Sequence, residues 1–226
     1  MREIVVDTET TGLDPLKGDR LVEIAGVELV NHVPTGNSFH RYINPQRDMP
    51  EEAFRIHGLS ADFLAGHPLF HEVIDDFLEF AGESRLIIHN AAFDMRFINA
   101  ELARLGRRGV PMDRAVDTLV MAQKRFPGAP NSLDALCRRF GVDSSARVKH
   151  GALLDCELLA EVYLNLLGGR QADLGLKVET RRSMVVQVTQ RTVRPARPHA
   201  ASPEELAAHR AFVARLKEPL WDLPEG

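Results

Sequence analysis

Short apolar runs and longer amphipathic stretches follow one another along this chain in an order that few folds can accommodate. Residues 4–6 and 86–88 are apolar runs typical of buried central strands. Residues 21–30 and 39–43 have the β-branched content of two further strands, separated by a Pro-Thr-Gly-Asn turn at 34–37. Strands joined so tightly are antiparallel, so the sheet cannot be purely parallel.

Amphipathic stretches between and after these strands predict helices that pack on the sheet. The predicted helices cover residues 70–81, about 90–105, 132–141 and about 152–167. Ser132 can cap the third helix and Gly141 can end it. A hairpin followed by alternating strands and helices predicts an α/β fold, a mixed sheet with helices on its faces.

The composition is that of a soluble globular domain with an appendage: the chain has 226 residues, of which 44% are hydrophobic and 27% charged. No run approaches the ~20 apolar residues of a membrane helix, and the first residues lack the pattern of a secretory signal. Cys137 and Cys156 lie within apolar helical patterns, so a disulfide framework or a cysteine zinc site is not expected. We expect a cytoplasmic protein without a membrane partner.

The net charge of −4 is unevenly distributed. Residues 1–170 hold 19 Lys and Arg against 25 Asp and Glu, a net of −6, and residues 171–226 hold 9 against 7, a net of +2. An acidic body argues against a nucleic-acid partner. It can still act on polyanions if bound divalent cations neutralise a cluster of carboxylates.

The composition changes after Gly169. Residues 180–203 contain five arginines, three prolines and no acid, which indicates a linker or binding segment without a core of its own. Ser202-Pro203-Glu204-Glu205 then has the pattern of a helix start, and that helix is expected to end near Lys217, before Trp221. We therefore expect one catalytic domain over residues 1–170 and an extended tail over 171–226.

Asp7 and Glu9 stand two residues apart at the end of the first strand. In extended backbone such residues point to the same side, so both carboxylates would project into one place. Like charges so close repel unless a cation lies between them. On their own, the two could equally be solvated acids at the end of a strand.

Three further residues have patterns that are weak singly. Asp94 falls in the first turn of the helix after residues 86–88, where an acid often only complements the helix dipole. His150 and Asp155 are separated by four residues, across a loop and the start of the last body helix. A lone loop histidine is usually incidental.

The combination is much more specific. The segments Asp-Thr-Glu-Thr-Thr-Gly, His-Asn-Ala-Ala-Phe-Asp and His-Gly-Ala-Leu-Leu-Asp follow one another at strand ends and helix starts, with matches also around residues 52–57 and 131–141. Together they resemble the DEDD-type 3′→5′ exonucleases of the histidine subgroup, and within it the family of proofreading (epsilon) subunits of bacterial DNA polymerase III. The resemblance covers residues 1 to about 170 closely and the tail more loosely.

This resemblance implies a ribonuclease H-like mixed sheet with helices on both faces and a 3′→5′ exonuclease that releases 5′-monophosphates from DNA. It implies that Asp7, Glu9 and Asp155 bind one metal ion, with Asp7 bridging to a second on which Asp94 holds a water. His150 would be the general base. Oxygen ligands select Mg²⁺ or Mn²⁺, and two such ions about 4 Å apart suit in-line displacement at phosphorus.

The resemblance also implies substrate contacts. Glu52 and His57 would meet the terminal nucleotide beside Asp7, Glu9 and Asp155, although a helix-start acid and a loop histidine are the plain alternative. His89 and Asn90 follow residues 86–88 and could line the site or simply end the strand; neither is assigned a role.

Two partners are expected for the tail. It suits docking to the polymerase III alpha subunit, because the helix after Ser202 and Trp221 offer an apolar anchor that could order on binding. Gln171, Leu174 and Leu176 have the spacing of a sliding-clamp ligand, although a Gln and two leucines in six residues also occur by chance.

Two other functions remain open at this point. An RNA-trimming exoribonuclease of the same superfamily would use the same metals and phosphates, because the sugar is read by details of the pocket. A binding module could use an inactive nuclease fold to hold single strands. The complete set Asp7, Glu9, Asp94, His150 and Asp155 argues against the second idea, and the long tail argues against the first.

Overall fold

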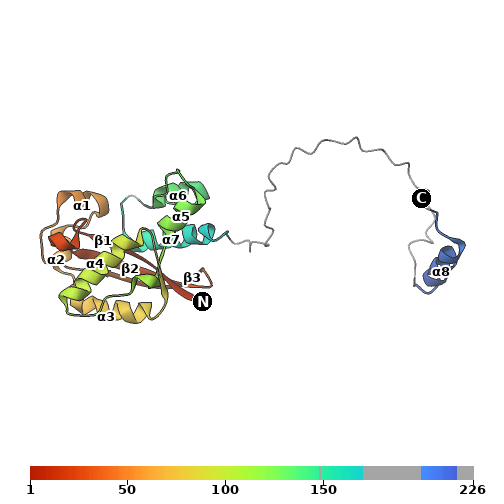
Figure 1. Ribbon diagram of the computed structural model, residues 1–226, viewed down its shortest axis with the longest axis horizontal. Helices are drawn as coiled ribbons and strands as arrows, with labels where there is room; N and C mark the ends of the chain where they lie inside the picture. Colours follow the sequence, from red (N-terminus) through yellow and green to blue (C-terminus); the bar gives the residue numbers. More distant parts are fainter. Residues whose placement is uncertain (148, 170–199, 218–226) are drawn as a thin grey trace. The chain divides into compact units, whose positions relative to one another are not determined.

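The computed structural model describes residues 1–147, 149–169 and 200–217 (Figure 1). The chain divides into two units, Met1–Leu176 and Lys177–Gly226. The first contains the sheet and its helices, and the second contains one described helix.

One mixed sheet forms the centre of the first unit. Its strand order is β3-β2-β1-β4-β5, made by β1 (Arg2–Thr10), β2 (Leu21–Val30), β3 (Val33–Tyr42), β4 (Arg85–Ile88) and β5 (Ala115–Asp117). β1 pairs antiparallel with β2 and parallel with β4, and β4 pairs parallel with β5. The predicted mixed α/β sheet is confirmed. Because β1, β4 and β5 are parallel, their carboxyl ends meet at one edge.

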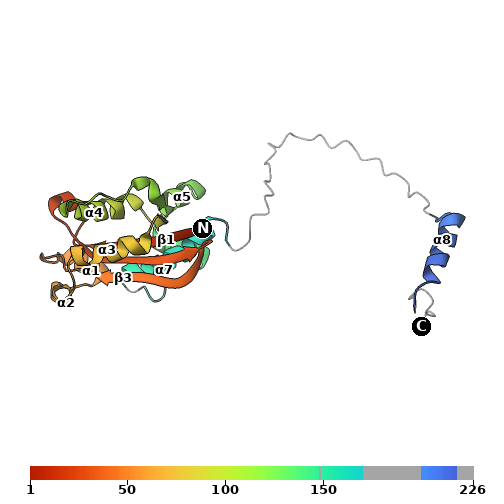
Figure 2. The ribbon, with the colours of Figure 1, turned by 90° about the horizontal axis from the view of Figure 1, so that it is seen from below.

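Helices cover both faces of this sheet (Figures 1 and 2). The α-helices of the described residues are α1 (Glu51–His57), α2 (Ala61–Ala65), α3 (Phe70–Ala81), α4 (Ala91–Arg104), α5 (Thr118–Arg125), α6 (Leu133–Phe140), α7 (Ala152–Leu166) and α8 (Pro203–Val213), with 3₁₀ turns η1 (Pro15–Lys17) and η2 (Met112–Arg114). No helix in the described ranges is long and apolar enough to cross a membrane.

The alternation of side chains along β1 builds two cores. Ile4 and Val6 join a cluster with α3 and α4, which contribute Phe77 and Phe97. Val5 points the other way, into a cluster formed with α6 and α7. Every second residue of a strand lies on one face. Asp7 and Glu9 therefore continue the side of Val5 and lie toward α7.

The hairpin between β2 and β3 corrects one expectation. The turn is formed by Asn31 and His32, both with positive φ (51° and 66°), as in a type I′ turn. The predicted turn at 34–37 is wrong, because these residues belong to β3. An edge strand tolerates proline, and the β2–β3 register shifts nearby, where Gly36 has φ 86°.

Most predicted helices are confirmed, including the Ser132 cap and the Gly141 stop of α6. No bounds were predicted for α1, α2, β5 and α5, because their sequences lack a strong apolar period. In the second unit, Ser202 and Glu205 form the expected capping box. The helix α8 ends at Val213 rather than near Lys217, and Trp221 lies outside the described residues.

Candidate active site

Two acids lie at the carboxyl end of β1. Asp7 and Glu9 share the α7 face of the sheet, and Glu9 is 8% exposed. The pairing register with β2 shifts directly after Glu9, one residue before the end of the strand. The predicted convergence of these two carboxylates on one face is what the structure has.

Asp94 approaches the same strand end from α4. Thr8, between the two acids, faces the opposite side and its hydroxyl donates a 2.7 Å hydrogen bond to Asp94 Oδ1. The start of α4 is held by Asp117 of β5, whose Oδ2 accepts from the Ala91 N–H at 3.1 Å. Asp94 is therefore a buried, oriented carboxylate rather than a solvated helix-start acid.

His150 lies in the loop before α7, and Asp155 lies in the first turn of that helix. Asp155 is buried and bonded to the guanidinium of Arg147 through both oxygens, at 2.5 and 2.6 Å. His150 Nδ1 lies 3.0 Å from Arg147 Nη2 and 3.5 Å from Asp155 Oδ2. The His150 N–H donates to the Ile56 carbonyl at 3.2 Å, which ties this loop to α1.

Three of the five predicted catalytic and metal-binding residues come close together in the described part of the chain. Glu9, His150 and Asp155 each offer a ligand atom within 4.8 Å of the others. Burial raises the pKa of Asp7 well above its usual value, and the charges of Asp94 and Glu9 add to this. Burial together with Glu23 raises the pKa of Glu9 to about 8, and burial raises that of Asp94 to about 7.

This arrangement fits divalent cations. In the described part of the chain Asp7, Glu9 and Asp94 form no ion pair, whereas Asp155 pairs with Arg147. Crowded carboxylates with raised pKa values are acids that lack a compensating positive charge. Their donor atoms are oxygens with one imidazole and no thiolate, a set that favours hard cations such as Mg²⁺ or Mn²⁺.

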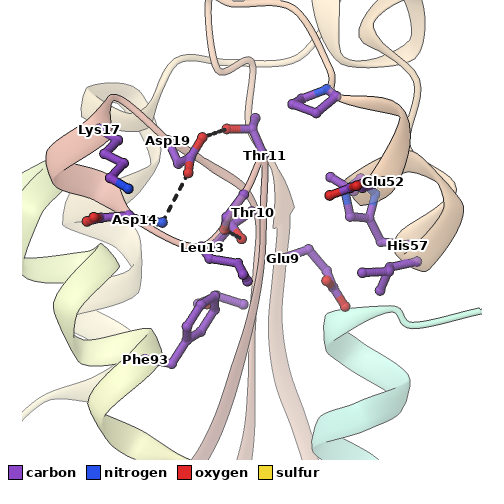
Figure 3. Close-up of a pocket in the computed structure, with 15 residues that line it drawn as sticks. Glu9, Thr10, Thr11, Leu13, Asp14, Lys17, Asp19, Glu52, His57 and Phe93 are labelled. Atoms are coloured by element: carbon purple, nitrogen blue, oxygen red, sulfur yellow. Dashed lines mark hydrogen bonds between the residues drawn. The ribbon is translucent and has the colours of Figure 1, made fainter.

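A cavity of about 540 Å³ opens beside Glu9. In Figure 3, Leu13 and Phe93 line it on the α4 side, and Glu52 and His57 line it on the α1 side. The structure thus places both predicted substrate contacts on the same cavity as Glu9. A pocket lined by both apolar and polar side chains suits a nucleotide, whose base is flat and whose sugar and phosphate form hydrogen bonds.

The two residues at the α1 side differ in exposure. Glu52 is exposed, while His57 is buried and its Nδ1 accepts from the Leu59 N–H at 3.0 Å. Burial lowers the pKa of His57, so a neutral ring faces the cavity. Its position is fixed by α1, which ends at His57 and turns at Gly58 with φ 77°.

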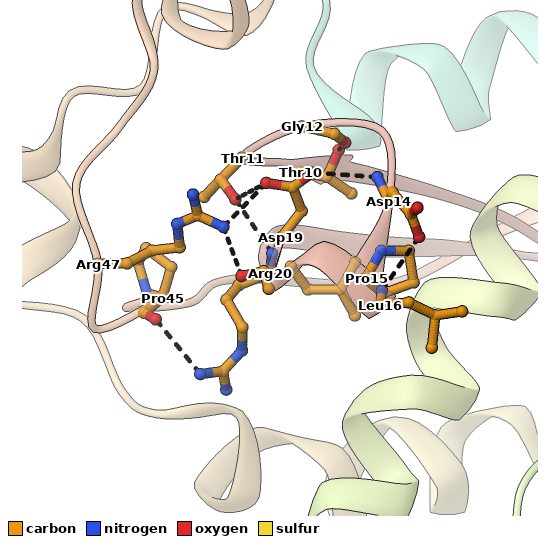
Figure 4. A network of polar contacts seen from close by, with 12 residues as sticks. Thr10, Thr11, Gly12, Asp14, Pro15, Leu16, Asp19, Arg20, Pro45 and Arg47 are labelled. Atoms are coloured by element: carbon orange, nitrogen blue, oxygen red, sulfur yellow. Dashed lines mark hydrogen bonds and ion pairs between the residues drawn. The ribbon is translucent and has the colours of Figure 1, made fainter.

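The loop between β1 and β2 forms the rim of the cavity and is held by a polar network (Figure 4). Asp19 accepts from the Asp14 N–H at 3.0 Å and from Arg47 Nη1 at 2.8 Å. A Cβ on Gly12 would lie 2.4 Å from Asp19 Oδ2. The loop is therefore packed closely enough to present Leu13 and Asp14 in a defined position.

His89 and Asn90, to which the sequence assigned no role, have structural contacts at the end of β4. His89 Nδ1 lies 2.9 Å from Thr118 Oγ1, on the side of α5. Asn90 has φ 66° and precedes α4, so it serves the sharp turn from β4 into that helix.

Sequence reasoning missed Thr8, Glu23 and Arg147. Glu23 lies opposite Glu9 on β2, is 2% exposed and is held by His40 Nε2 at 2.6 Å. An acid between apolar residues of a predicted strand was the available signal for Glu23. Arg147 had none, because a loop arginine is ordinary until the partners are known.

Comparison with known proteins shows the class of enzyme to which this chain belongs. Residues 4–163 match the exonuclease family of RNase T type. Among solved structures, exonuclease X in complex with 5′-overhanging duplex DNA has a TM-score of 0.57 at 24% identity, covering 73% of this chain and 90% of that one. The nuclease domain of a 3′ exonuclease of the DEDDh family, bound to rAMP, has a TM-score of 0.63 at 18% identity, covering 74% and 91%. The family match defines an exonuclease, and its fold is that of the DEDDh exonucleases, a class that depends on divalent metal ions.

Closer relatives are epsilon subunits. The DNA polymerase III subunit epsilon of Rickettsia felis is 51% identical over 96% of this chain and 97% of its own length. That of Escherichia coli K12 is 44% identical over 93% and 91%. The chain belongs to the family of DNA polymerase III epsilon subunits. It is a 3′→5′ proofreading exonuclease.

Proposed function

We propose that Asp7, Glu9, Asp94 and Asp155 hold two divalent cations, Mg²⁺ or Mn²⁺, and that His150 is the general base. The observation that carries this proposal is the position of Glu9, which lines the cavity and offers a ligand atom within 4.8 Å of those of His150 and Asp155. Burial also raises the pKa values of Asp7, Glu9 and Asp94. When bound, such ions activate water and stabilise the attacking and leaving oxygens at phosphorus.

The protein residues supply orientation and proton transfer. Thr8 orients Asp94 by its hydrogen bond, so the carboxylate is preorganised. His150 is 47% exposed at the rim of the cluster, where it can take a proton from an attacking water. Its backbone bond to Ile56 keeps it beside α1 and the cavity.

The substrate proposed for the cavity is the 3′-terminal nucleotide of single-stranded DNA. The base would lie against Leu13 and Phe93, and Glu52 and His57 would contact the sugar end. The scissile phosphate would then meet Asp7, Glu9 and Asp155. Hydrolysis releases the terminal nucleotide as a 5′-monophosphate. Family membership favours this substrate over RNA, and the complete acid cluster disfavours a non-catalytic binding module.

Asp7→Ala tests this proposal. We expect it to abolish Mg²⁺-dependent exonuclease activity on single-stranded DNA, to below a few per cent, while the protein stays folded. Stability without metal should be unchanged or slightly higher, because one repelling acid is gone. Asp75→Ala, on the exposed side of α3, is the matched control and should keep full activity. Substantial activity of Asp7→Ala with Mg²⁺ would refute the site.

We also propose that the tail, residues 171–226, binds the polymerase III alpha subunit. One support is the composition of residues 180–203, which are rich in arginine and proline and contain no acid. The other is the capped helix α8, on which Leu206 and Phe212 are exposed. Exposed apolar side chains on a short helix are suited to docking in a groove of a partner.

A sliding-clamp contact through Gln171, Leu174 and Leu176 belongs to the same proposal. These residues lie outside the described ones, so the sequence pattern is the support. A contact this short should be weak alone, about 10⁻⁴ M or −5.5 kcal/mol, and should matter only when the polymerase tethers it. Replacing all three with alanine should spare nuclease activity and weaken assembly of the polymerase on the clamp in gel filtration. Unchanged assembly would reduce the segment to a linker.

A further inference from the structure

Arg147 is a buried cation inside the acidic cluster. Its side chain is 7% exposed, and its guanidinium contacts three groups from different parts of the fold. Both oxygens of Asp155 are engaged, at 2.5 and 2.6 Å, and Asp134 of α6 accepts from Nη1 at 2.6 Å. A side-on fork of this kind is the strongest arginine–carboxylate geometry.

The position of this fork conflicts with the role proposed for Asp155. A divalent cation at Asp155 would share its ligand with a guanidinium, and two positive charges on one buried carboxylate repel strongly. The other acids of the cluster have no such partner in the described part of the chain. The guanidinium therefore binds both oxygens of Asp155, the atoms that a divalent cation would need as ligands.

We propose that Arg147 is the internal counter-cation of the cluster in the metal-free protein and competes with the divalent cation for Asp155. This rests on the proposed function, which makes Asp155 a metal ligand. Arg147 stabilises the empty cluster and raises the cation concentration at which the site fills. Asp134 anchors the arginine from outside the site and so sets the strength of this competition.

The same guanidinium also engages the proposed base. Arginine has only donors, so His150 Nδ1 accepts the 3.0 Å hydrogen bond from Nη2. A neutral ring then carries its proton on Nε2, and neither nitrogen is free to accept a proton from water. Displacement of Arg147 from Asp155 would release His150 as well, which couples filling of the site to activation of the base.

Calorimetric titration of the full-length, metal-free protein with MnCl₂ at neutral pH tests this. Arg147→Gln should bind Mn²⁺ about tenfold more tightly than the unmodified chain, a change of about 1.4 kcal/mol. Its metal-free melting temperature should be lower, because Asp155 and Asp134 lose their partner. Asp134→Asn leaves every proposed ligand intact and should tighten Mn²⁺ binding by a smaller factor. Arg107→Gln, which removes a surface ion pair with Asp75, should change neither quantity.

The outcomes separate the two proposals. If the unmodified protein binds Mn²⁺ but Arg147→Gln binds it equally or more weakly, the competition is overturned and the metal site stands. If Arg147→Gln does not fold, Asp134→Asn decides, and unchanged Mn²⁺ affinity there overturns the competition. If the unmodified protein binds no Mn²⁺ and cleaves no DNA, the metal site and the competition fall together.

Discussion

At the scale of single residues, Glu9 of β1 is held in surroundings that favour its protonated form. Glu9 and Glu23 lie opposite each other on neighbouring strands. His40 lies within hydrogen-bonding distance of Glu23, and Glu9 has no such histidine partner among the described residues. Burial, with the charge of Glu23, raises the pKa of Glu9 from 4.5 to about 8. A folded-state pKa above the unfolded value means that the folded protein binds this proton more tightly than the unfolded chain.

The sign of the stability effect follows from linkage. Between pH 4.5 and about 8 the unfolded chain has released the Glu9 proton, so rising pH reduces the stability of the metal-free protein. In EDTA, Glu9→Gln should therefore melt above the unmodified protein, by a margin that grows from pH 5 to pH 8 to at least several degrees. Excess Mg²⁺ should reverse the order, because the unmodified acid then has its cation.

Calorimetric melting curves over this pH range provide the measurement. Glu79→Gln, an exposed position on α3, should follow the unmodified protein throughout and serves as the control. A margin that shrinks as the pH rises would contradict the raised pKa of Glu9.

At the scale of elements, the loop between β1 and β2 decides how the cavity is presented. Asp19 holds the loop through Asp14 and Arg47, and Gly12 packs against its carboxylate without room for a Cβ (Figure 4). The acids proposed to bind the metal ions lie on β1, α4 and α7 instead. The loop should therefore affect substrate binding more than chemistry.

Gly12→Ala tests this division. Displacement of Asp19 should raise KM for single-stranded DNA by roughly tenfold, the effect of losing about 1.4 kcal/mol of binding, with a smaller change in kcat. Gly66→Ala, where a Cβ meets open space and φ is −87°, should leave both constants unchanged. Steady-state kinetics separates the constants, and a loss confined to kcat would contradict the proposed role of the loop.

At the scale of the whole molecule, the first unit contains a complete pair of cores. Among the described residues, both clusters draw only on residues up to Leu166, on either face of the sheet. The end of α7 is fixed by Arg125, whose Nη1 donates to the Asn165 and Leu166 carbonyls at 2.7 and 2.8 Å. Folding and nuclease activity should therefore not require the tail.

A chain ending at Gly169 should keep full activity on short single-stranded DNA and lose association with the polymerase. Copurification with a tagged polymerase measures the second property, and the full-length chain is the reference. Stoichiometric copurification of the shortened chain would show that the polymerase contacts the first unit instead.

The sequence by itself determined the elements whose causes are local. These are the helix over residues 70–81, the cap and stop of α6 at Ser132 and Gly141, and the two apolar strands. Each depends on a pattern within a few residues, so its structure could be predicted. Short or weakly periodic elements such as α1 and β5 could not, because their helical or strand state depends on what they pack against. The turn at Asn31 and His32 was missed because strand pairing, rather than turn composition, fixed its place.

The candidate site divides in the same way. Five candidate site residues could be predicted, because the motifs that contain them resemble those of a known family: Asp7, Glu9, Asp94, His150 and Asp155. Only the tertiary structure brought Glu23 opposite Glu9 and Arg147 onto Asp155, since these partners come from separate elements. The charges that such neighbours impose depend on distance and burial. For that reason the residue types could be predicted from the sequence, while their burial, their charged neighbours and the resulting pKa shifts were decided by the tertiary structure.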